Sequence, residues 1–200
     1  MIEPVSVPQP LFYFGAMSPY SWFAAERIDA LLPEARWQGV LAGGIFKANG
    51  RTSWGLTDAR ERGLADCEAR ARAYGLGPIR WPRPWPTSDL TVARAMVYAD
   101  RQGRLKPYAL AAMRLSFLEG VDLGELDAVL EAAGRAGLDA AEMREAITSE
   151  EIKEGLRAAT GEALDAGVFG VPTVLLGEEP YWGDDTLERA VASYRVLDRL

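Results

Sequence analysis

The feature that most constrains the fold is a strand, a helix and a second strand that follow one another near the start of the chain. The segment "PLFYFGA" has the aromatic composition of a short strand. Ser18 then supplies a helix N-cap, and Pro19 takes the first helical position, where its missing N–H costs nothing. Apolar residues recur at helical spacing until Pro33 ends the helix, and "ARWQGVL" follows as a second strand. This order predicts a parallel strand pair joined by a crossover helix.

The middle of the chain has a different character, because Ala, Leu, Glu and Arg recur there at helical periods and no convincing strand is present. The sequence predicts helices over residues 57–74, 87–102, 106–118, 123–136 and 140–165, the last with a break near Ser149. Strand character returns with "VPTVLLG" and "EPYWG", a candidate hairpin. A final helix follows, in which Asp185 and Glu188 have the spacing of a capping box.

These parts combine into a β-α-β half, a helical block and a β-β-α half. The predicted fold class is α/β, with a split domain over residues 1–55 and 168–200 and an all-helical insertion over residues 56–167. At 200 residues, of which 48% are hydrophobic, the chain is long enough to bury a substantial core.

Charge and hydropathy exclude several classes of partner. The chain has 29 acidic and 22 basic residues and a formal net charge of -7, so nucleic acid and anionic membrane surfaces are not expected partners. No apolar run approaches the roughly 20 residues of a membrane helix. The segment "MIEPVSVPQP" also lacks the cationic start and the apolar stretch of a signal peptide, so the expected location is the cytoplasm.

Two residue types are almost missing, and their scarcity narrows the possible chemistry. The chain has no histidine, which excludes Ser-His-Asp catalysis and histidine metal sites, and no metal is expected. It has one cysteine, Cys67, so neither an internal disulfide nor a CxxC redox pair can form. Cys67 lies in a predicted helix, where a free cysteine is typically a small buried side chain.

Three segments carry a family resemblance: "FYFGAMSPYSW", "LAGGIFKANG" and "GVFGVPTVLLGEEPYWGDD". In this order, with an Xaa-Pro opening the third strand, the chain resembles the DsbA-like branch of the thioredoxin fold. Within that branch it is similar to 2-hydroxychromene-2-carboxylate isomerases and kappa-class glutathione transferases. The resemblance implies a thioredoxin fold with a helical insertion, glutathione as cofactor, a small aromatic or electrophilic substrate, and a homodimer.

In redox members of this fold the turn after the first strand would read Cys-Pro-Xaa-Cys, so Ser18 and Ser21 stand where two cysteines would be. A serine hydroxyl cannot carry out thiol-disulfide exchange, but it can donate a hydrogen bond to the sulfur of a bound thiol. Free N–H groups and the helix dipole also favour a negative charge at a helix N-terminus. The resemblance therefore implies that Ser18 is catalytic and stabilises the thiolate of glutathione or another low-molecular-weight thiol.

The resemblance also implies a set of cofactor contacts. Val171 precedes Pro172 in a peptide bond that is cis in these families, and its backbone would pair with the cofactor backbone as an added strand does. Asp184 and Asp185 would bind the γ-glutamyl amine, and Lys47 would bind a carboxylate of the cofactor or the substrate. The alternatives are a trans proline at an edge strand, two acids that only cap a helix, and a surface lysine.

The substrate side of the site is less well defined by the sequence. The candidate substrate contacts are Trp182, Tyr20, Asn49 and Trp81, with Trp85 as a weaker candidate. Arg51 is a weaker candidate than Lys47 for a carboxylate of the cofactor or the substrate. Aromatic residues commonly line small-molecule sites, but the tryptophans of "RWPRPWP" could equally pack against a core. The chain departs from the families in two places: Thr186 stands where they usually carry an arginine, and Thr87 and Ser88 replace an asparagine-serine pair.

Three functions are compatible with these residues. The first is a glutathione-dependent isomerase, in which the thiolate adds to a conjugated aromatic substrate, the intermediate rotates about what is now a single bond, and elimination returns the thiol. The second is a kappa-like glutathione transferase, in which the thiol stays attached to an electrophile. The third is a DsbA-like binding protein without catalytic activity.

Overall fold

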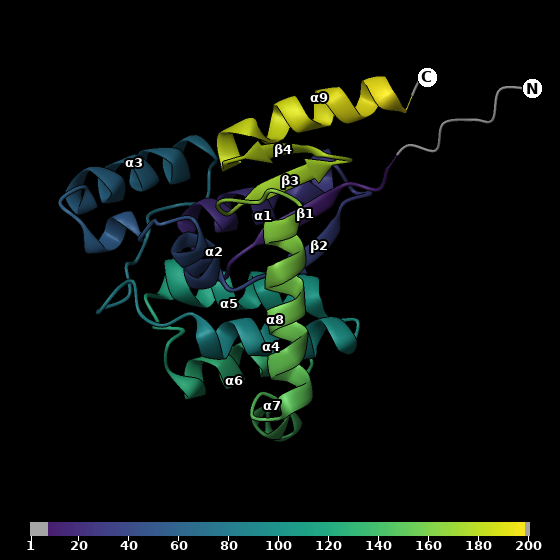
Figure 1. Cartoon of the computed structure of the whole chain (residues 1–200). Helices are drawn as coiled ribbons and strands as arrows, with labels where there is room; N and C mark the ends of the chain where they lie inside the picture. The colour runs from purple at the N-terminus through teal and green to yellow at the C-terminus, as the bar shows by residue number, and fades with distance from the viewer. Residues whose placement is uncertain (1–7, 199–200) are drawn as a thin grey trace, which may run out of the picture.

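The computed structural model describes residues 8–198, which include a four-stranded sheet (Figure 1). The strands are β1 (Leu11–Phe14), β2 (Arg36–Gly39), β3 (Thr173–Leu176) and β4 (Glu179–Trp182). Their order is β2-β1-β3-β4; β1 runs parallel to β2, whereas β3 runs antiparallel to both β1 and β4. The predicted parallel pair and the predicted hairpin are both confirmed.

Helices connect and cover these strands. They are α1 (Pro19–Leu31), α2 (Ala42–Ala48), α3 (Arg60–Ala73), α4 (Leu90–Arg101), α5 (Leu105–Glu119), α6 (Leu126–Arg135), α7 (Ala140–Ala146), α8 (Glu150–Asp165) and α9 (Leu187–Leu197), with 3-10 turns η1 (Trp54–Leu56) and η2 (Asp184–Thr186). Ser149 caps α8 by accepting a hydrogen bond from the Ile152 N–H, so the predicted break is confirmed. Figure 1 shows α4 to α7 gathered at one end of the molecule and α9 at the other. None of the helices in the described range has the length and hydropathy that crossing a membrane requires.

The strands alternate between two apolar clusters, as is typical of a sheet that is covered on both faces. Phe12 and Phe14 are fully buried in one cluster with residues of α1 and α9. Tyr13 lies in the other cluster, with Ile45 of α2. The first cluster continues into the helical block, where Met113 of α5 belongs to it. The core therefore runs across the predicted domain boundaries at residues 55 and 168.

No helix was predicted around Lys47, yet this segment forms the short helix α2. Gly43 and Gly44 have low helix propensity. Packing and capping compensate for it: Asp89, which precedes α4, accepts a hydrogen bond from the Gly43 N–H at 3.0 Å, and Ile45 is fully buried. Contacts from distant parts of the chain therefore override the local preference.

The predicted capping box of the last helix is also wrong. Helix α9 begins only at Leu187, its N-cap is Thr186, and no side chain caps it. The 3-10 turn η2 precedes the helix and takes up Asp185, and the Glu188 carboxylate pairs instead with Arg27 of α1. The spacing was correct for a capping box, but the helix starts too late to use it.

Candidate functional site

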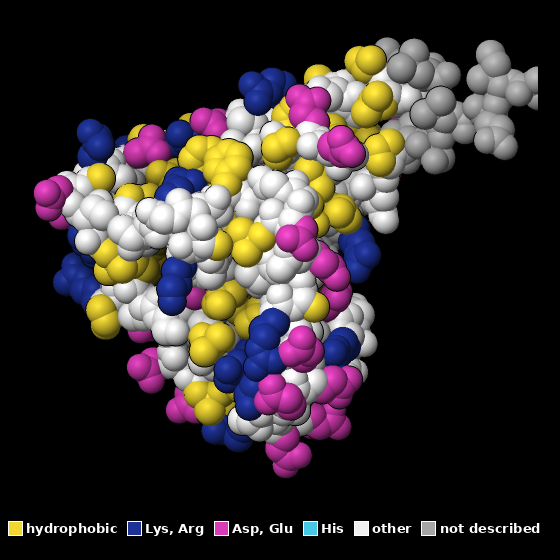
Figure 2. All heavy atoms as spheres, viewed as in Figure 1, with side chains coloured by type: hydrophobic (Ala, Val, Ile, Leu, Met, Phe, Trp, Pro, Cys, Tyr) yellow, Lys and Arg dark blue, Asp and Glu magenta, His cyan; other side chains and the backbone are white. Residues whose placement is uncertain are grey.

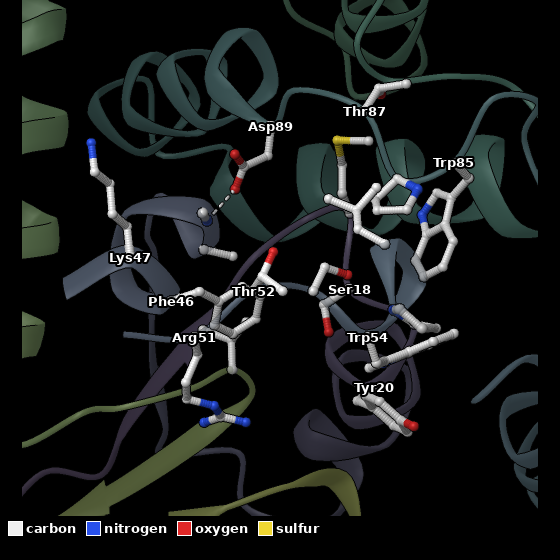
Figure 3. Close-up of a pocket in the computed structure, with 18 of the residues that line it drawn as sticks. Ser18, Tyr20, Phe46, Lys47, Arg51, Thr52, Trp54, Trp85, Thr87 and Asp89 are labelled. Carbon is white, nitrogen blue, oxygen red and sulfur yellow. Dashed lines mark hydrogen bonds between the residues drawn. The ribbon is translucent and has the colours of Figure 1, made fainter. Parts of the chain in front are cut away.

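A cavity of about 640 Å³ lies at the N-terminal end of α1. Its walls come from the start of α1, from α2 and the loop after it, from the loop before α4, and from the segments around Val171 and Trp182. Aromatic side chains make up much of the lining: Tyr20, Phe46, Trp54 and Trp85 (Figure 3), together with Trp182. Polar and charged side chains from the same segments complete the lining, and a mainly apolar wall with some polar groups is usual in sites for small molecules.

Ser18 lies on the cavity wall and is the N-cap of α1. Its Oγ accepts a hydrogen bond from the Ser21 N–H at 3.2 Å, and the Trp22 N–H donates to the Ser18 carbonyl at 3.0 Å. Pro19 has no N–H, so among the first N–H groups of α1 only that of Tyr20 has no partner within the described chain. The Ser18 hydroxyl proton and this N–H are both donors that a negatively charged ligand atom could use.

Ser21 occupies a quite different environment, although it is only three positions away. Its side chain is fully buried, and its Oγ accepts a hydrogen bond from the Gly15 N–H at 3.3 Å. Of the two serines that replace cysteines, Ser18 is therefore the one that borders the cavity. Ser21 belongs to the core between β1 and α1.

The Val171-Pro172 peptide bond is cis, as the resemblance implies. Val171 lines the cavity, and neither its N–H nor its carbonyl takes part in a hydrogen bond within the described chain. The next carbonyl, that of Pro172, accepts from the Gly183 N–H at 2.9 Å. The Val171 backbone is thus an unpaired donor and acceptor at the edge of the cavity, which an extended ligand could use.

The two acids expected to bind the cofactor amine differ sharply from each other, and neither lines the cavity. Asp184 is only 1% exposed, and its oxygens accept hydrogen bonds from Arg70 Nη1 at 3.1 Å and Tyr74 Oη at 2.8 Å. Burial raises the pKa of the Asp184 carboxyl group, and the hydrogen bonds from Tyr74 and Arg70 oppose that shift. Asp185 is exposed and lies 3.4 Å from Arg70, so it is the acid that a ligand can reach.

Arg70 connects these acids to the cavity wall. Its Nε donates to the Asp66 carboxylate at 2.9 Å, and the Tyr20 hydroxyl donates to the same carboxylate oxygen at 3.2 Å. Burial is the main reason why the pKa of Tyr20 is raised, which keeps its phenol protonated as a donor. We call Asp66, Arg70, Tyr74 and Asp184 the Arg70 cluster; through Tyr20 it fixes one side of the cavity.

Two cations line the cavity, and they are held differently. The guanidinium of Arg51 donates to the Phe169 carbonyl at 3.1 Å and lies 4.9 Å from the centroid of the Trp182 ring. Lys47 is exposed near the end of α2, and in Figure 3 its side chain extends away from Ser18. Neither cation has a carboxylate partner among residues 8–198.

The mouth of the cavity is apolar as well as basic. Trp182 is 41% exposed and packs against Phe169 with ring centroids 5.0 Å apart. Figure 2 shows hydrophobic side chains with basic side chains beside them over α2 and β4. The expected contribution of Trp182 to an aromatic pocket fits this position.

Two expected substrate contacts lie outside the cavity lining. Asn49 ends α2, where its side-chain amide donates to the Ile45 carbonyl at 2.9 Å. Trp81 lies behind the wall, with its ring centroid 4.8 Å from that of Trp85 and its indole N–H donating to Glu68 at 3.3 Å. Both residues support the cavity wall from outside the lining.

The sequence interpretation missed Phe46, Trp54 and Asp89, which also line the cavity. Gly63 is an isolated glycine in α3, and such a glycine often marks a close contact with another part of the chain. The contact here is Trp54, whose ring would lie 2.3 Å from a Cβ at Gly63. No local sequence pattern indicated that Asp89 would line the cavity. Burial raises the pKa of its carboxyl group, and the hydrogen bond from Gly43 opposes this.

Cys67 is fully buried, as predicted. Burial raises the pKa of its thiol to about 12, with the carboxylates of Asp66 and Asp184 also raising it. A thiol of this kind is not ionised at neutral pH and is a poor nucleophile. No cluster of His, Cys, Asp or Glu in the described residues has the arrangement of a metal site.

Comparison with known proteins agrees with the predicted fold. A family model described as a DsbA-like thioredoxin domain matches residues 11–195. The 2-hydroxychromene-2-carboxylate isomerases of Sphingobium xenophagum and Pseudomonas putida are 26% and 25% identical to the chain; each match covers 88% of this chain, and 93% and 89% of the respective relative.

Two solved structures show the same architecture. A 2-hydroxychromene-2-carboxylate isomerase superposes with a TM-score of 0.83 at 23% identity, covering 95% of this chain and 96% of the other. The cytosolic disulfide reductase DsbM from Pseudomonas aeruginosa, solved with GSH, superposes with a TM-score of 0.65 at 16% identity, covering 96% and 99%. The thioredoxin fold with a helical insertion is therefore confirmed.

Proposed function

Because the chain belongs to the DsbA-like thioredoxin family, we propose that it is a glutathione-dependent isomerase that resembles 2-hydroxychromene-2-carboxylate isomerase and acts on a small conjugated aromatic substrate. One observation carries the proposal: the Ser18 hydroxyl and the unpaired Val171 backbone border the same cavity, and aromatic side chains form much of its wall. A thiol held by these groups would face an aromatic compound bound between the rings.

The residues around the cavity fit a thiol peptide. The Val171 N–H and carbonyl suit an extended backbone, and Asp185 is exposed for an ammonium group. Lys47 is a cation for a carboxylate of the cofactor or of the substrate. The name of the DsbM structure, which was solved with GSH, supports a glutathione site in this fold. When bound, glutathione supplies a nucleophilic sulfur for reversible addition to a conjugated double bond.

The contribution of the chain is to stabilise charge and to orient the substrate. The Ser18 hydroxyl donates a hydrogen bond to the sulfur, and the Tyr20 N–H and the dipole of α1 favour the thiolate form. Together they lower the pKa of a bound thiol from about 8.5 towards neutrality. The rings of Phe46, Trp54 and Trp182 hold a planar substrate beside the sulfur and exclude water.

The proposed reaction belongs in the cytoplasm, where low-molecular-weight thiols are kept reduced. The names of the relatives support the isomerase activity, because those relatives match over most of their own length. A transferase would use the same thiolate but would consume the thiol. The two activities are distinguished by measuring the free thiol, which an isomerase returns and a transferase consumes.

The function is tested by comparing Ser18→Ala with Ser21→Ala in the glutathione-dependent isomerisation of 2-hydroxychromene-2-carboxylate. We expect Ser18→Ala to lower kcat/KM by about 100-fold, the effect of losing one donor to a developing charge. Ser21→Ala is the matched control, because it removes a hydroxyl that faces the core. It should keep most of the activity and lower the free energy of unfolding by about 1 kcal/mol.

Full turnover by Ser18→Ala would contradict the mechanism. Stoichiometric loss of free thiol during incubation with an aryl halide, without isomerisation, would identify a transferase instead. If the wild-type protein neither isomerises the substrate nor consumes thiol, the third function, that of a binding protein, is correct.

A further inference from the structure

Opposite charges flank the Val171 backbone at the edge of the cavity, and they determine how an extended ligand can lie there. On the Pro172 side, the Pro172 carbonyl is bonded to Gly183, which leads directly into Asp184 and the exposed Asp185. On the opposite side, the carbonyl of Phe169 is bonded to Arg51. We propose that Arg51 binds the C-terminal carboxylate of the thiol cofactor and thereby sets the direction in which the cofactor lies. This inference rests on the proposed function.

The direction follows from the charges. Glutathione carries both an ammonium group and a carboxylate at its γ-glutamyl end, and a carboxylate alone at its glycine end. Its ammonium group meets Asp185 and its glycine carboxylate meets Arg51 only when it runs antiparallel to residues 169–172. Its middle residue then lies opposite the unpaired Val171 N–H and carbonyl. The sulfur of that middle residue can reach the wall where Ser18 lies. The reverse orientation would place the glycine carboxylate, which has no ammonium group beside it, against the exposed Asp185 carboxylate.

The length of the ligand also allows its terminal carboxylate to reach Arg51. Phe169, the anchor of Arg51, is two residues from Val171, and two extended residues span at most about 7 Å. One ligand residue and its terminal carboxylate, measured from the middle residue, cover a similar length. The carboxylate therefore arrives near the guanidinium without crossing the cavity, which leaves the aromatic walls free for the substrate.

The guanidinium of Arg51 is held in place by more contacts than the ammonium group of Lys47. The guanidinium lies 4.9 Å from the Trp182 ring centroid and 5.8 Å from that of Phe46, and its Nη1 donates to Phe169. These contacts fix the planar group and leave other N–H donors for a carboxylate. Lys47 has no hydrogen bond or ion pair within residues 8–198 that would fix its ammonium group. It remains available for a substrate carboxylate.

The test measures binding rather than activity. Isothermal titration calorimetry compares glutathione with its glycine monoethyl ester, which lacks only the terminal charge, in four proteins: wild type, Arg51→Gln, Arg51→Lys and Lys47→Gln. The wild-type protein should bind glutathione about 10-fold more tightly than the ester. Arg51→Gln should bind both ligands equally, with its affinity for the ester unchanged, and Arg51→Lys should recover part of the preference. Lys47→Gln should keep the full preference.

The other outcomes refute the proposal in different ways. If the preference persists in Arg51→Gln and disappears in Lys47→Gln, Lys47 is the carboxylate partner and the inference is wrong while the proposed function stands. If the wild-type protein binds both ligands equally, no cation of the protein binds this carboxylate, and the inference is wrong. If it binds neither ligand, the thiol cofactor itself is wrong, and both proposals fall. Binding that depends on Arg51 without any isomerisation would refute only the isomerase.

Discussion

Two charged regions lie at the cavity, one behind its wall and one on its lining, and their charges are used in opposite ways. In the Arg70 cluster the buried Asp184 carboxylate has both oxygens bonded inside the chain, and Arg70 contacts three carboxylates. At the opposite side, Arg51 and Lys47 have no carboxylate partner in the described part of the chain. Charges that are satisfied internally hold the cavity in shape, whereas unpaired charges on its lining are available to a ligand.

The largest expected effect tests the structural role of the cluster. Asp184→Ala leaves the Arg70 charge and the Tyr74 hydroxyl without their buried partner. We expect the free energy of unfolding, measured by urea titration, to fall by about 3 kcal/mol. Asp185→Ala is the matched control: its carboxylate is exposed, so the loss should be about 0.5 kcal/mol or less. Equal losses in the two variants would contradict the contrast between the adjacent acids.

A smaller effect is expected from Tyr74→Phe, which removes one hydrogen bond from the cluster. The Tyr74 hydroxyl donates to Asp184 at 2.8 Å, and the guanidinium of Arg27 lies 4.0 Å from the Tyr74 ring centroid. Phenylalanine keeps the ring for Arg27, so only the hydrogen bond is lost, at about 1 kcal/mol in urea unfolding. A loss as large as that of Asp184→Ala would show that the ring position, rather than the bond, holds the cluster.

The pH dependence sharpens the same contrast. Burial raises the pKa of Asp184 above its ordinary value, so the folded protein binds this proton more tightly than the unfolded chain does. The stability of the wild type relative to Asp184→Asn should therefore fall as the pH rises from about 4 through the raised folded pKa. Urea titrations of both proteins between about pH 4 and pH 7 measure this difference. A difference that grows with pH would mean that the Arg70 guanidinium and the Tyr74 hydrogen bond outweigh burial.

The smallest effect on stability is expected on the opposite side of the cavity. Arg51→Gln and Lys47→Gln remove charges without carboxylate partners, so each should change the free energy of unfolding by about 0.5 kcal/mol or less. Urea titration checks this against the cluster variants. A loss above about 1 kcal/mol in Arg51→Gln would assign its contacts with Phe169 and Trp182 to stability rather than to a ligand.

The sequence predicted the parts of the site that depend on local patterns. The N-cap position of Ser18 follows from the strand, turn and helix around it, and the cis bond between Val171 and Pro172 was implied by the family resemblance of a continuous motif. The ends of the long helices were close to those predicted because Ser149 and the apolar periodicity are also local signals.

The rest of the site depends on contacts between distant residues. Arg70 and Asp184 are 114 positions apart, and Gly43 and Asp89 are 46 apart, so no spacing rule connects them. Asp184 and Asp185 are adjacent in sequence and looked equivalent, yet the fold buries one and exposes the other. Arg51 looked weaker than Lys47 because its partner Phe169 lies in another segment.

The unbroken core between the sheet and the helical block has a consequence for how new substrate ranges can arise in this fold. Because Phe14 of the sheet and Met113 of α5 belong to one apolar cluster, a helical block grafted from a relative would meet a poorly matched surface and leave voids that destabilise the chimera. Substitutions at exposed lining positions such as Leu56 avoid this cost. Single changes at the cavity wall, rather than exchange of whole segments, are the accessible route to altered specificity.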